Sequence, residues 1–211
     1  MFAVRIIAGR FRRRKLLANP GRTTRPLTDF AKEVLFERLA GDVEGKRIAD
    51  VFAGTGTIGL EALSRGAAGV VFIEHDRRAA ELLRRNVASL GVEDETLCWE
   101  TDVLRCSFRP RDVPHLLPFD TVFFDPPYRM IDDLQPGSPL YRALQRLLKE
   151  DVTSPDALLV LRTPAKIEFE IPPEWVYDRT IDLKSMHVHL YDKTLAENVG
   201  DVDEQPKTDE G

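Results

Sequence analysis

The chain has 211 residues, with 30 Lys or Arg, 35 Asp or Glu and a formal net charge of −5. This length fits one domain, or one domain with an appendage, and it is enough to bury a substantial core. No apolar run approaches the ~20 residues of a membrane span and the N-terminus lacks the layout of a signal peptide, so we expect a cytoplasmic protein without membrane contact.

Basic residues gather at the N-terminus. Residues 1 to 25 contain eight Lys or Arg and no acid, which leaves 22 basic against 35 acidic residues, or −13, in the remainder. A basic face on an acidic body is typical of a protein that contacts phosphate groups at one edge. The alternative is a solvated charge run without a partner. We favour contact with nucleic acid, although the net charge of the whole chain alone argues against it.

The first predicted elements are a basic hairpin and a helix. Residues 4 to 17 read as two short extended stretches with a glycine near the turn between them. Thr28 or Asp29 can cap a helix that runs to about Leu39. Its predicted apolar stripe comprises Phe30, Val34, Leu35 and Leu39. We expect residues 1 to 42 to form an appendage for substrate contacts and residues 43 to 195 to form the main domain.

A strand, a tight loop and a helix N-terminus follow. Residues 47 to 52 form an apolar strand, the loop carries Gly54 and Gly56, and residues 57 to 65 have helical periodicity around Gly59. Glycines at these places let the backbone turn sharply, approach a ligand closely and pack helix on strand. The helix N-terminus favours polar or anionic ligand groups. The pattern predicts a loop that holds a nucleotide-like cofactor.

The next strand, residues 69 to 74, ends in Glu74, which lies twenty residues after Gly54. A carboxylate at this spacing binds a ribose in dinucleotide-type folds. A helix over residues 77 to 90 and a strand over residues 96 to 101 continue the alternation. Alternating strands and helices of this length predict an α/β fold with a mostly parallel sheet and helices on both faces.

The run from Phe119 to Asp125 is a further buried strand, and it ends in Asp125-Pro126-Pro127-Tyr128. A hydride-transfer enzyme has no particular use for this tetrapeptide, whereas a methyltransferase acting on an exocyclic amine does. The Asp125 carboxylate and the Pro126 carbonyl can accept the two N–H groups of the amine, so that its lone pair points at the methyl donor. Tyr128 offers a flat face for a base swung out of its strand.

Two expectations follow for the chemistry. An unperturbed pKa of ~3.9 would leave Asp125 ionised at neutral pH. The cofactor is predicted to be S-adenosylmethionine rather than a nicotinamide dinucleotide, because methyl transfer to a positioned amine is a direct displacement that depends mainly on alignment.

The C-terminal part is predicted to complete the sheet. Ser138 and Pro139 start a helix, residues 157 to 161 form a buried strand, and residues 175 to 183 and 186 to 193 form an antiparallel pair. Residues 196 to 211 are acidic and are expected to form a disordered tail without an assigned role.

With the glycine loop, Glu74 and the Asp125 tetrapeptide, the chain resembles the bacterial 16S ribosomal RNA guanine-N2 methyltransferases over roughly residues 4 to 193. The N-terminal motifs are the more specific ones, because DNA adenine methyltransferases share Asp-Pro-Pro-Tyr. The N-terminal motifs comprise Arg5-Ile-Ile-Ala-Gly9, Arg14-Lys-Leu16, Arg25-Pro-Leu-Thr-Asp29 and Glu33-Val-Leu-Phe36, and the resemblance also includes Gly59-Leu-Glu-Ala-Leu-Ser-Arg65. Where the family has Arg-Pro-Thr-Thr-Asp-Arg, this chain has Leu27 and Phe30, a departure on the expected RNA-contacting surface.

The resemblance implies a seven-stranded, Rossmann-like S-adenosylmethionine methyltransferase sheet and a guanine of 16S ribosomal RNA, within the small ribosomal subunit, as substrate. The catalytic residues would be Asp125, Pro126, Pro127 and Tyr128. The cofactor would be held by Asp50, Phe52, Ala53, Gly54, Gly56, Glu74, His75 and Asp102. The predicted RNA contacts are Arg10, Arg12, Arg13, Arg14, Arg25 and Thr28.

Three other functions stay open at this stage. They are a DNA adenine-N6 methyltransferase, a nicotinamide-dependent oxidoreductase and an RNA-binding module without catalysis. The compact size and the lack of a separate target-recognition domain disfavour the first, and the Asp125 tetrapeptide disfavours the last. Cys98 and Cys106 match no common metal or redox spacing, so we predict free thiols and no metal site.

Overall fold

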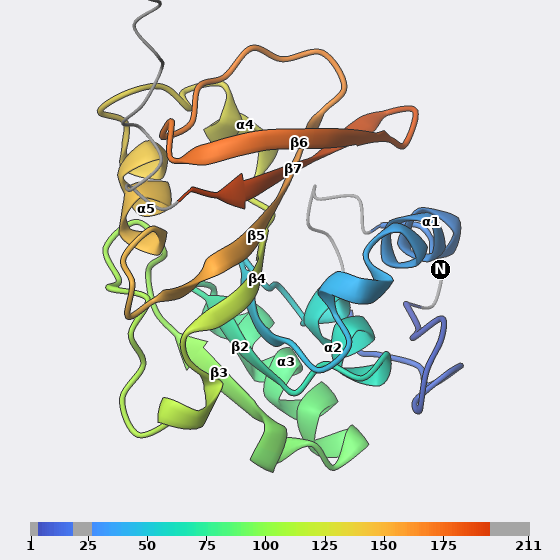
Figure 1. Ribbon diagram of the computed structural model, residues 1–211. Coiled ribbons are helices and arrows are strands. Elements are labelled where there is room, and N and C mark those ends of the chain that lie inside the picture. The colour runs from blue at the N-terminus through green and yellow to red at the C-terminus, as the bar shows by residue number, and fades with distance from the viewer. Residues whose placement is uncertain (1–3, 19–26, 195–211) are drawn as a thin grey trace, which may run out of the picture.

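The computed structural model describes residues 4–18 and 27–194 and shows a seven-stranded sheet between two layers of helices (Figure 1). The strand order is β3-β2-β1-β4-β5-β7-β6. The strands are β1 Arg47–Val51, β2 Gly69–Glu74, β3 Thr96–Glu100, β4 Phe119–Phe124, β5 Thr153–Pro164, β6 Trp175–Asp182 and β7 Met186–Lys193. The predicted fold class is confirmed. The predicted acidic tail, residues 196 to 211, lies outside the described residues.

The strands from β3 to β5 in the sheet order pair in parallel, and the pairs at the β6 edge are antiparallel. β1 pairs with β2 and β4, β2 with β3, and β4 with β5, all in parallel. β7 runs antiparallel to both β5 and β6, as predicted for the last pair. The strand expected at residues 157 to 161 is the centre of the longer β5, whose first four residues were missed because Pro155 interrupts the apolar run. The pairing of β5 with β4 is irregular at that point, between Phe119 and Thr121.

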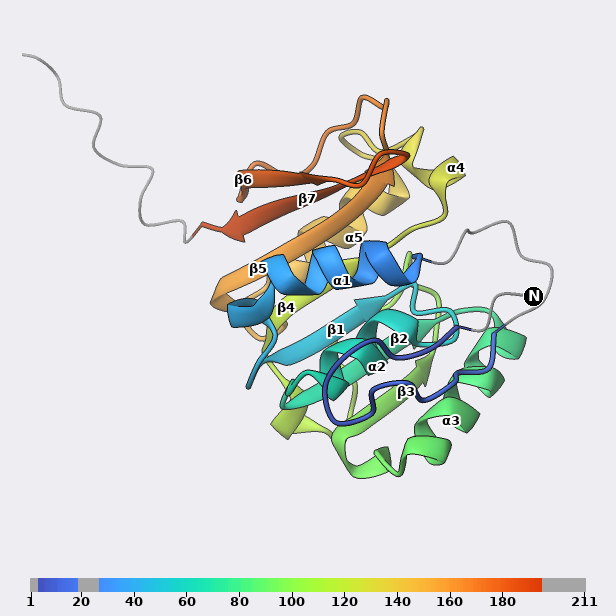
Figure 2. The same cartoon turned by 90° about the vertical axis from the view of Figure 1, so that its right-hand side faces the viewer.

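The helices are α1 Asp29–Arg38, α2 Thr57–Ser64, α3 Arg77–Leu90, α4 Tyr128–Ile131 and α5 Pro139–Leu147, with 3-10 turns at Ala40–Asp42, Glu93–Glu95 and Pro114–Leu116. α1, α2 and α3 cover one face of the sheet and α5 covers the other (Figure 1, Figure 2). α4 was not predicted, because a helix of four residues has no periodicity to recognise.

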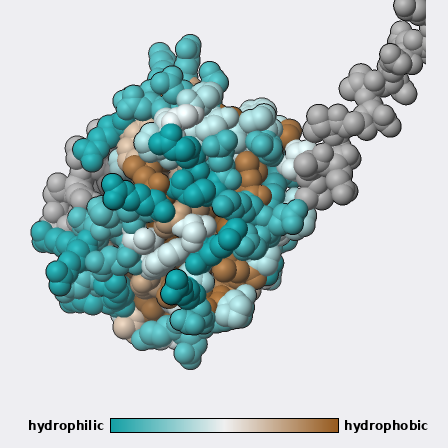
Figure 3. Space-filling view, turned by 90° about the vertical axis from the view of Figure 1, so that its left-hand side faces the viewer, coloured by the Kyte–Doolittle hydropathy of each residue, from teal (hydrophilic) through white to brown (hydrophobic). Residues whose placement is uncertain are grey.

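Each face of the sheet has its own hydrophobic core. One core joins Ile6 and Leu35 to Leu60 and Leu83 on the side of α1, α2 and α3. The other lies under α5 and includes Leu144. The outer surface on the α5 side is mainly hydrophilic, with hydrophobic residues in separate small patches (Figure 3). This is the surface expected of elements whose apolar sides face the sheet.

The predicted helix start at Thr28 is correct, but the predicted apolar stripe is partly wrong. The Oγ1 of Thr28 accepts a hydrogen bond from the N–H of Ala31 at 3.1 Å and caps α1. Phe30 was assigned to the buried stripe, yet its side chain is 68% exposed. The buried side of α1 is formed by Ala31, Lys32, Leu35 and Phe36. Successive helical positions lie ~100° apart, so a stripe centred on these residues turns Phe30 outward.

The predicted N-terminal hairpin is a loop rather than a pair of strands. Its two arms are joined by a single antiparallel bridge, between Arg5 and Lys15, and by backbone hydrogen bonds such as Ile6 N–H to Arg14 O at 3.0 Å. The loop packs against α2 so closely that a Cβ on Gly9 would lie 1.7 Å from the carbonyl oxygen of Ser64. Several backbone donors of the segment bond to α2, which leaves no regular cross-strand ladder.

Candidate functional site

The predicted catalytic and cofactor-binding residues lie at one edge of the sheet. β1, β2, β3 and β4 are parallel, so the loops that follow them emerge on the same side. The strand order reverses between β1 and β4, and ligands of open α/β sheets bind at such a switch point. The N–H of Asp125 donates to the carbonyl of Val51 at 3.2 Å, which places the tetrapeptide beside the glycine loop.

The glycine loop has the backbone geometry that its sequence predicts. Gly54 and Gly56 have φ angles of 58° and 81°, in the left-handed region that favours glycine. A Cβ on Gly56 would lie 2.4 Å from the side chain of Leu83, whereas a Cβ on Gly54 would meet no atom within 4 Å. Gly56 therefore permits close packing on α3, and Gly54 leaves open space in front of the loop.

Glu74 links the end of β2 to the glycine loop. Its Oε2 accepts the N–H of Gly54 at 2.7 Å, and its Oε1 accepts the N–H of Asp76 at 2.6 Å. Each carboxylate oxygen has a second lone pair, so the group can still accept hydrogen bonds from ribose hydroxyls. His75, the next predicted cofactor residue, is exposed directly after β2. These positions fit the predicted binding of a ribose.

Asp50 lies behind the loop rather than on its surface. The side chain is buried, and its Oδ2 accepts the N–H of Gly59, in the first turn of α2, at 2.9 Å. Burial raises the pKa of Asp50 to about 7, and the negative charges of Asp125 and Glu74 add to the rise. Three carboxyl groups therefore gather in the corner formed by the ends of β1, β2 and β4, and Asp50 is only partly ionised at neutral pH.

The remaining predicted cofactor residues are Phe52 and Ala53, which pack with the hydrophobic cores, and Asp102, which lies in a polar turn. The ring of Phe52 packs edge-on against that of Phe124, with centroids 5.5 Å apart, and Ala53 is buried beside it. Asp102 follows β3, where its Oδ1 accepts the N–H of Leu104 at 2.9 Å. Asp102 also forms a partly exposed ion pair with Arg105, at 3.6 Å. Asp102 thus shapes the turn after β3 at the same edge of the sheet.

Arg162 is a candidate site residue that the sequence analysis missed. Its Nε donates to the Oδ1 of Asp125 at 2.6 Å, and the two side chains are only 10% and 14% exposed. Its guanidinium carbon lies 5.8 Å from the centre of the Tyr128 ring, within the range of a cation–π contact. A charged residue at the end of the buried run of β5 was the available signal.

The pKa of Asp125 departs from the ordinary value that the sequence analysis assumed. Burial raises the pKa, and the ion pair and hydrogen bond with Arg162 oppose the rise. The carboxyl group of Asp125 therefore does not ionise like an exposed one. Its charged form is stabilised by Arg162. Pro126 is buried, and the side chain of Tyr128, which begins α4, is 38% exposed. A planar ring is thus accessible next to a fixed carboxylate.

The basic N-terminal residues are not equally available. The Nη2 of Arg10 pairs with Glu95 at 2.5 Å, and that of Arg14 donates to the carbonyl of Ser89. Within residues 4–18 and 27–194, Arg12 and Arg13 have no ion-pair partner. The hydroxyl of Thr28 is used as the cap of α1. Arg25 lies outside the described residues.

The described part of the chain contains neither a membrane-spanning helix nor a cluster of potential metal ligands. No helix there is long and apolar enough to cross a membrane. No group of three or more His, Cys, Asp or Glu side chains in those residues is arranged to hold a metal ion. Cys98 and Cys106 are free thiols, as predicted.

Comparisons with known proteins identify relatives of the whole described domain. A family model described as conserved hypothetical protein 95 matches residues 4–192. The ribosomal RNA small subunit methyltransferase D of Haemophilus influenzae is 33% identical over 177 residues, which are 82% of this chain and 84% of that protein. The protein of the same name from Escherichia coli K12 is 39% identical over 127 residues, 60% of this chain and 61% of that one.

Solved structures agree with these relatives. A structure described as putative methyltransferase yhhF from Escherichia coli has a TM-score of 0.71 and 31% identity and covers 92% of this chain and 99% of that one. An RNA methyltransferase from Salinibacter ruber, in complex with S-adenosyl-L-homocysteine, has a TM-score of 0.58 and 22% identity and covers 85% of this chain and 100% of that chain. At that identity the second likeness supports the fold alone.

Proposed function

The chain belongs to the family of ribosomal RNA small subunit methyltransferase D, and we propose that it transfers a methyl group from S-adenosylmethionine to the exocyclic N2 of a guanine in 16S ribosomal RNA. One observation carries the proposal: the Asp125 carboxylate, fixed by Arg162, lies beside the glycine loop and next to an accessible aromatic ring. The substrate is an rRNA guanine within the small subunit, and the reaction takes place in the cytoplasm.

Asp125 and its neighbours prepare the amine for attack. Asp125 accepts one N–H of the guanine amine and the backbone carbonyl of Pro126 accepts the other, which localises the lone pair that is otherwise delocalised into the ring. The two consecutive prolines restrict the backbone, so the acceptors are held in place before the base arrives. Tyr128 stacks the flipped base, a contact worth ~1–3 kcal/mol. The nitrogen becomes acidic only as it is methylated, so Asp125 or solvent takes the proton late.

The charge of the corner favours S-adenosylmethionine over a dinucleotide. The carboxylate of Glu74 at this edge attracts the positively charged sulfonium and ammonium groups of such a ligand and repels a pyrophosphate. Glu74 holds the ribose, and the open space before Gly54 admits the ligand. When bound, the cofactor supplies the methyl group. Alignment of amine and methyl donor accounts for most of the acceleration, for which ~7–11 kcal/mol is a general ceiling.

The N-terminal segment, defined as residues 4–18, supplies the RNA contacts. Arg12 and Arg13 are exposed in the segment and are available for phosphate groups, whereas Arg10 and Arg14 bond within the protein. In this proposal, residues 1 to 42 form the RNA-contacting part and residues 43 to 195 form the methyltransferase domain. Ile6 and Leu16 pack into the core shared with α2, so the two parts are built on one core.

The test is a methyl-transfer assay with labelled S-adenosylmethionine and three substrates. These are small ribosomal subunits that lack the modification, naked 16S RNA and duplex DNA. The expected result is label in RNA, carried by a guanosine after digestion. Label in DNA would instead support the adenine-N6 activity that shares the Asp-Pro-Pro-Tyr motif, and it would overturn the assignment of the N-terminal segment.

A further inference from the structure

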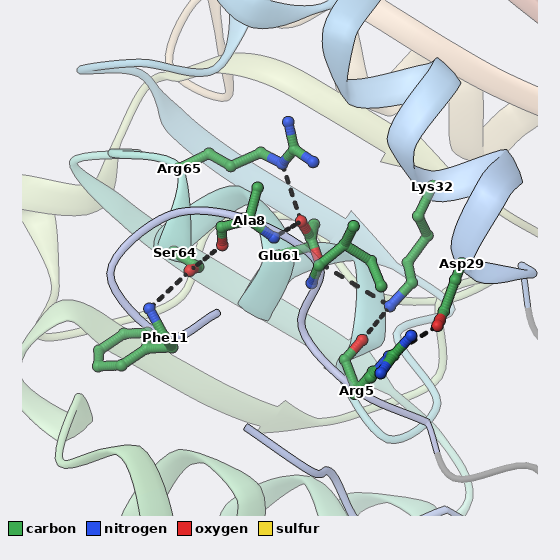
Figure 4. Close-up of polar contacts among 9 residues, drawn as sticks. Arg5, Ala8, Phe11, Asp29, Lys32, Glu61, Ser64 and Arg65 are labelled. Carbon is green, nitrogen blue, oxygen red and sulfur yellow. Dashed lines mark hydrogen bonds and ion pairs between the residues drawn. The ribbon is translucent and has the colours of Figure 1, made fainter. Parts of the chain in front are cut away.

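The N-terminal segment is held by buried polar side chains of α2 (Figure 4). Glu61 is 0% exposed, and its carboxylate accepts the N–H of Ile7 at 2.7 Å and that of Ala8 at 3.1 Å. One turn on, the Oγ of Ser64 accepts the N–H of Phe11 at 2.9 Å and donates to the carbonyl of Ala8 at 2.6 Å. These bonds fix the backbone of the segment. The side chains of Arg12 and Arg13 therefore extend from a backbone that is held in one position.

Cations surround the buried Glu61. Arg65 donates to Oε1 at 2.8 Å, and the Nζ of Lys32 lies 3.8 Å from Oε2 and donates to the carbonyl of Arg5 (Figure 4). Burial lowers the pKa of Lys32, and the charge of Glu61 opposes that shift. The cluster joins α1, α2 and the segment, but none of these hydrogen bonds and ion pairs reaches the glycine loop.

Asn86 on α3 makes the link to the glycine loop. It is 1% exposed, and its Oδ1 accepts the N–H of Leu17 at 2.8 Å. Its Nδ2 donates to the carbonyl of Leu17 at 3.1 Å and to the carbonyl of Thr55 at 2.9 Å. Both amide hydrogens are thus used, one on the end of the segment and one between Gly54 and Gly56 in the proposed cofactor loop.

We propose that Asn86 is a positioning residue that couples the N-terminal segment to the cofactor loop, so that binding of S-adenosylmethionine and binding of RNA strengthen each other. The proposal rests on the function proposed above. Thr55 stands between two glycines in left-handed conformations, and a displacement of its carbonyl changes the geometry of the Asn86 amide. The same amide holds Leu17 through two bonds, so the displacement is passed to the segment. Coupling of this kind is reciprocal for the two ligands.

The experiment compares Asn86→Asp with Ser64→Ala and with Glu81→Gln. Asn86→Asp keeps the oxygen that accepts the N–H of Leu17. It replaces the NH2 group, which donates to the carbonyls of Leu17 and Thr55, by an oxygen that cannot donate to them when ionised. Ser64→Ala loosens the segment and makes no contact with the loop. Glu81→Gln changes an exposed residue of α3 and is the matched control. KM values for S-adenosylmethionine and for small subunits, kcat and the fraction of folded protein are measured for each.

Asn86→Asp is expected to raise both KM values by about fivefold or more, the lower end of typical coupling. Ser64→Ala is expected to raise the KM for RNA but not the KM for S-adenosylmethionine. Glu81→Gln is expected to change neither KM value. If Asn86→Asp lowers kcat or the folded fraction while both KM values stay unchanged, the residue is merely structural and the inference is overturned. If the wild-type protein methylates no RNA, the proposed function fails, which is a different outcome.

A measurement on the wild-type protein keeps the inference testable if Asn86→Asp does not fold. Amide hydrogen exchange at Leu17 is followed with and without S-adenosylhomocysteine. The N–H of Leu17 bonds to Asn86, so the ligand is expected to slow its exchange by about fivefold or more. Exchange at Leu17 that is indifferent to a saturating concentration of the ligand would contradict the coupling.

Discussion

The proposed catalytic corner, around Asp125 and Arg162, and the N-terminal segment both contain ion pairs of low exposure, but the exposure of the carboxylate differs between them. In the segment, Glu61 is 0% exposed, and its bonds go to backbone N–H groups and to two cations. At the corner, the Asp125–Arg162 pair keeps some exposure and lies against an accessible ring. The fully buried Glu61 carboxylate holds the architecture, whereas the Asp125 carboxylate, at 14% exposure, can meet a ligand, as the proposed mechanism requires.

The largest expected effect is on stability and comes from the enclosed cluster. Glu61→Gln leaves the buried Lys32 and the partly exposed Arg65 without their anion, so the free energy of unfolding should fall by about 3–5 kcal/mol. Urea denaturation measures the change, with Glu81→Gln as control. A loss below about 1 kcal/mol would mean that the cluster does not hold the segment, and the contrast with the corner would disappear.

The corner should respond in reaction rate. Asp125→Asn keeps the size of the side chain but removes the charged acceptor, a hydrogen bond worth about 1.5–3 kcal/mol. kcat is therefore expected to fall by roughly 10-fold to 100-fold or more. Affinity for S-adenosylhomocysteine, measured by calorimetry, should be retained as the control. Near-normal turnover in this variant would exclude Asp125 as the group that positions the amine.

Removal of Arg162 should shift the pH dependence of the reaction. Burial already raises the pKa of Asp125 and Arg162 opposes that rise, so Arg162→Met should raise the pKa further. The carboxylate must be ionised to accept the amine N–H, so the acid limb of kcat should move to higher pH, by about one unit or more. Arg129→Met, an exposed neighbour on α4, is the matched control. An acid limb at the same pH in both variants would show that Asp125 does not titrate there.

The smallest effect concerns RNA affinity. Each phosphate contact contributes about 0.7–0.9 to the slope of log K against log salt, so replacing Arg12 and Arg13 by Ser should reduce that slope by roughly 1.4–1.8. The matched double variant of Arg10 and Arg14 should change it less, because their guanidinium groups already bond to Glu95 and Ser89. Equal changes in the two variants would remove the distinction between free and bonded cations in the segment.

The local motifs of the cofactor edge could be predicted from the sequence. The glycine loop and Glu74 are separated by fixed numbers of residues, and the contact between Gly54 and Glu74 follows from that spacing. The helix over residues 77 to 90 was predicted with its observed bounds, because Gly91 ends it in a left-handed conformation.

The long-range contacts could not be predicted in this way. Arg162 meets Asp125 across 37 residues, and Asn86 meets Leu17 across 69. The first contact depends on strand register, because Phe124 pairs with Leu161 and so brings the next residue of each strand together. The second depends on how the segment crosses α2 and α3. No periodicity within either stretch of sequence contains that information.

The most direct test of the central claim is the identity of the methylated nucleoside. Small subunits lacking the modification are incubated with the wild-type protein or with Asp125→Asn and labelled S-adenosylmethionine, and the digested RNA is analysed by mass spectrometry. The proposed mechanism predicts N2-methylguanosine with the wild-type protein and strongly reduced label with the variant. Label on any other nucleoside, or equal label from both proteins, would contradict it.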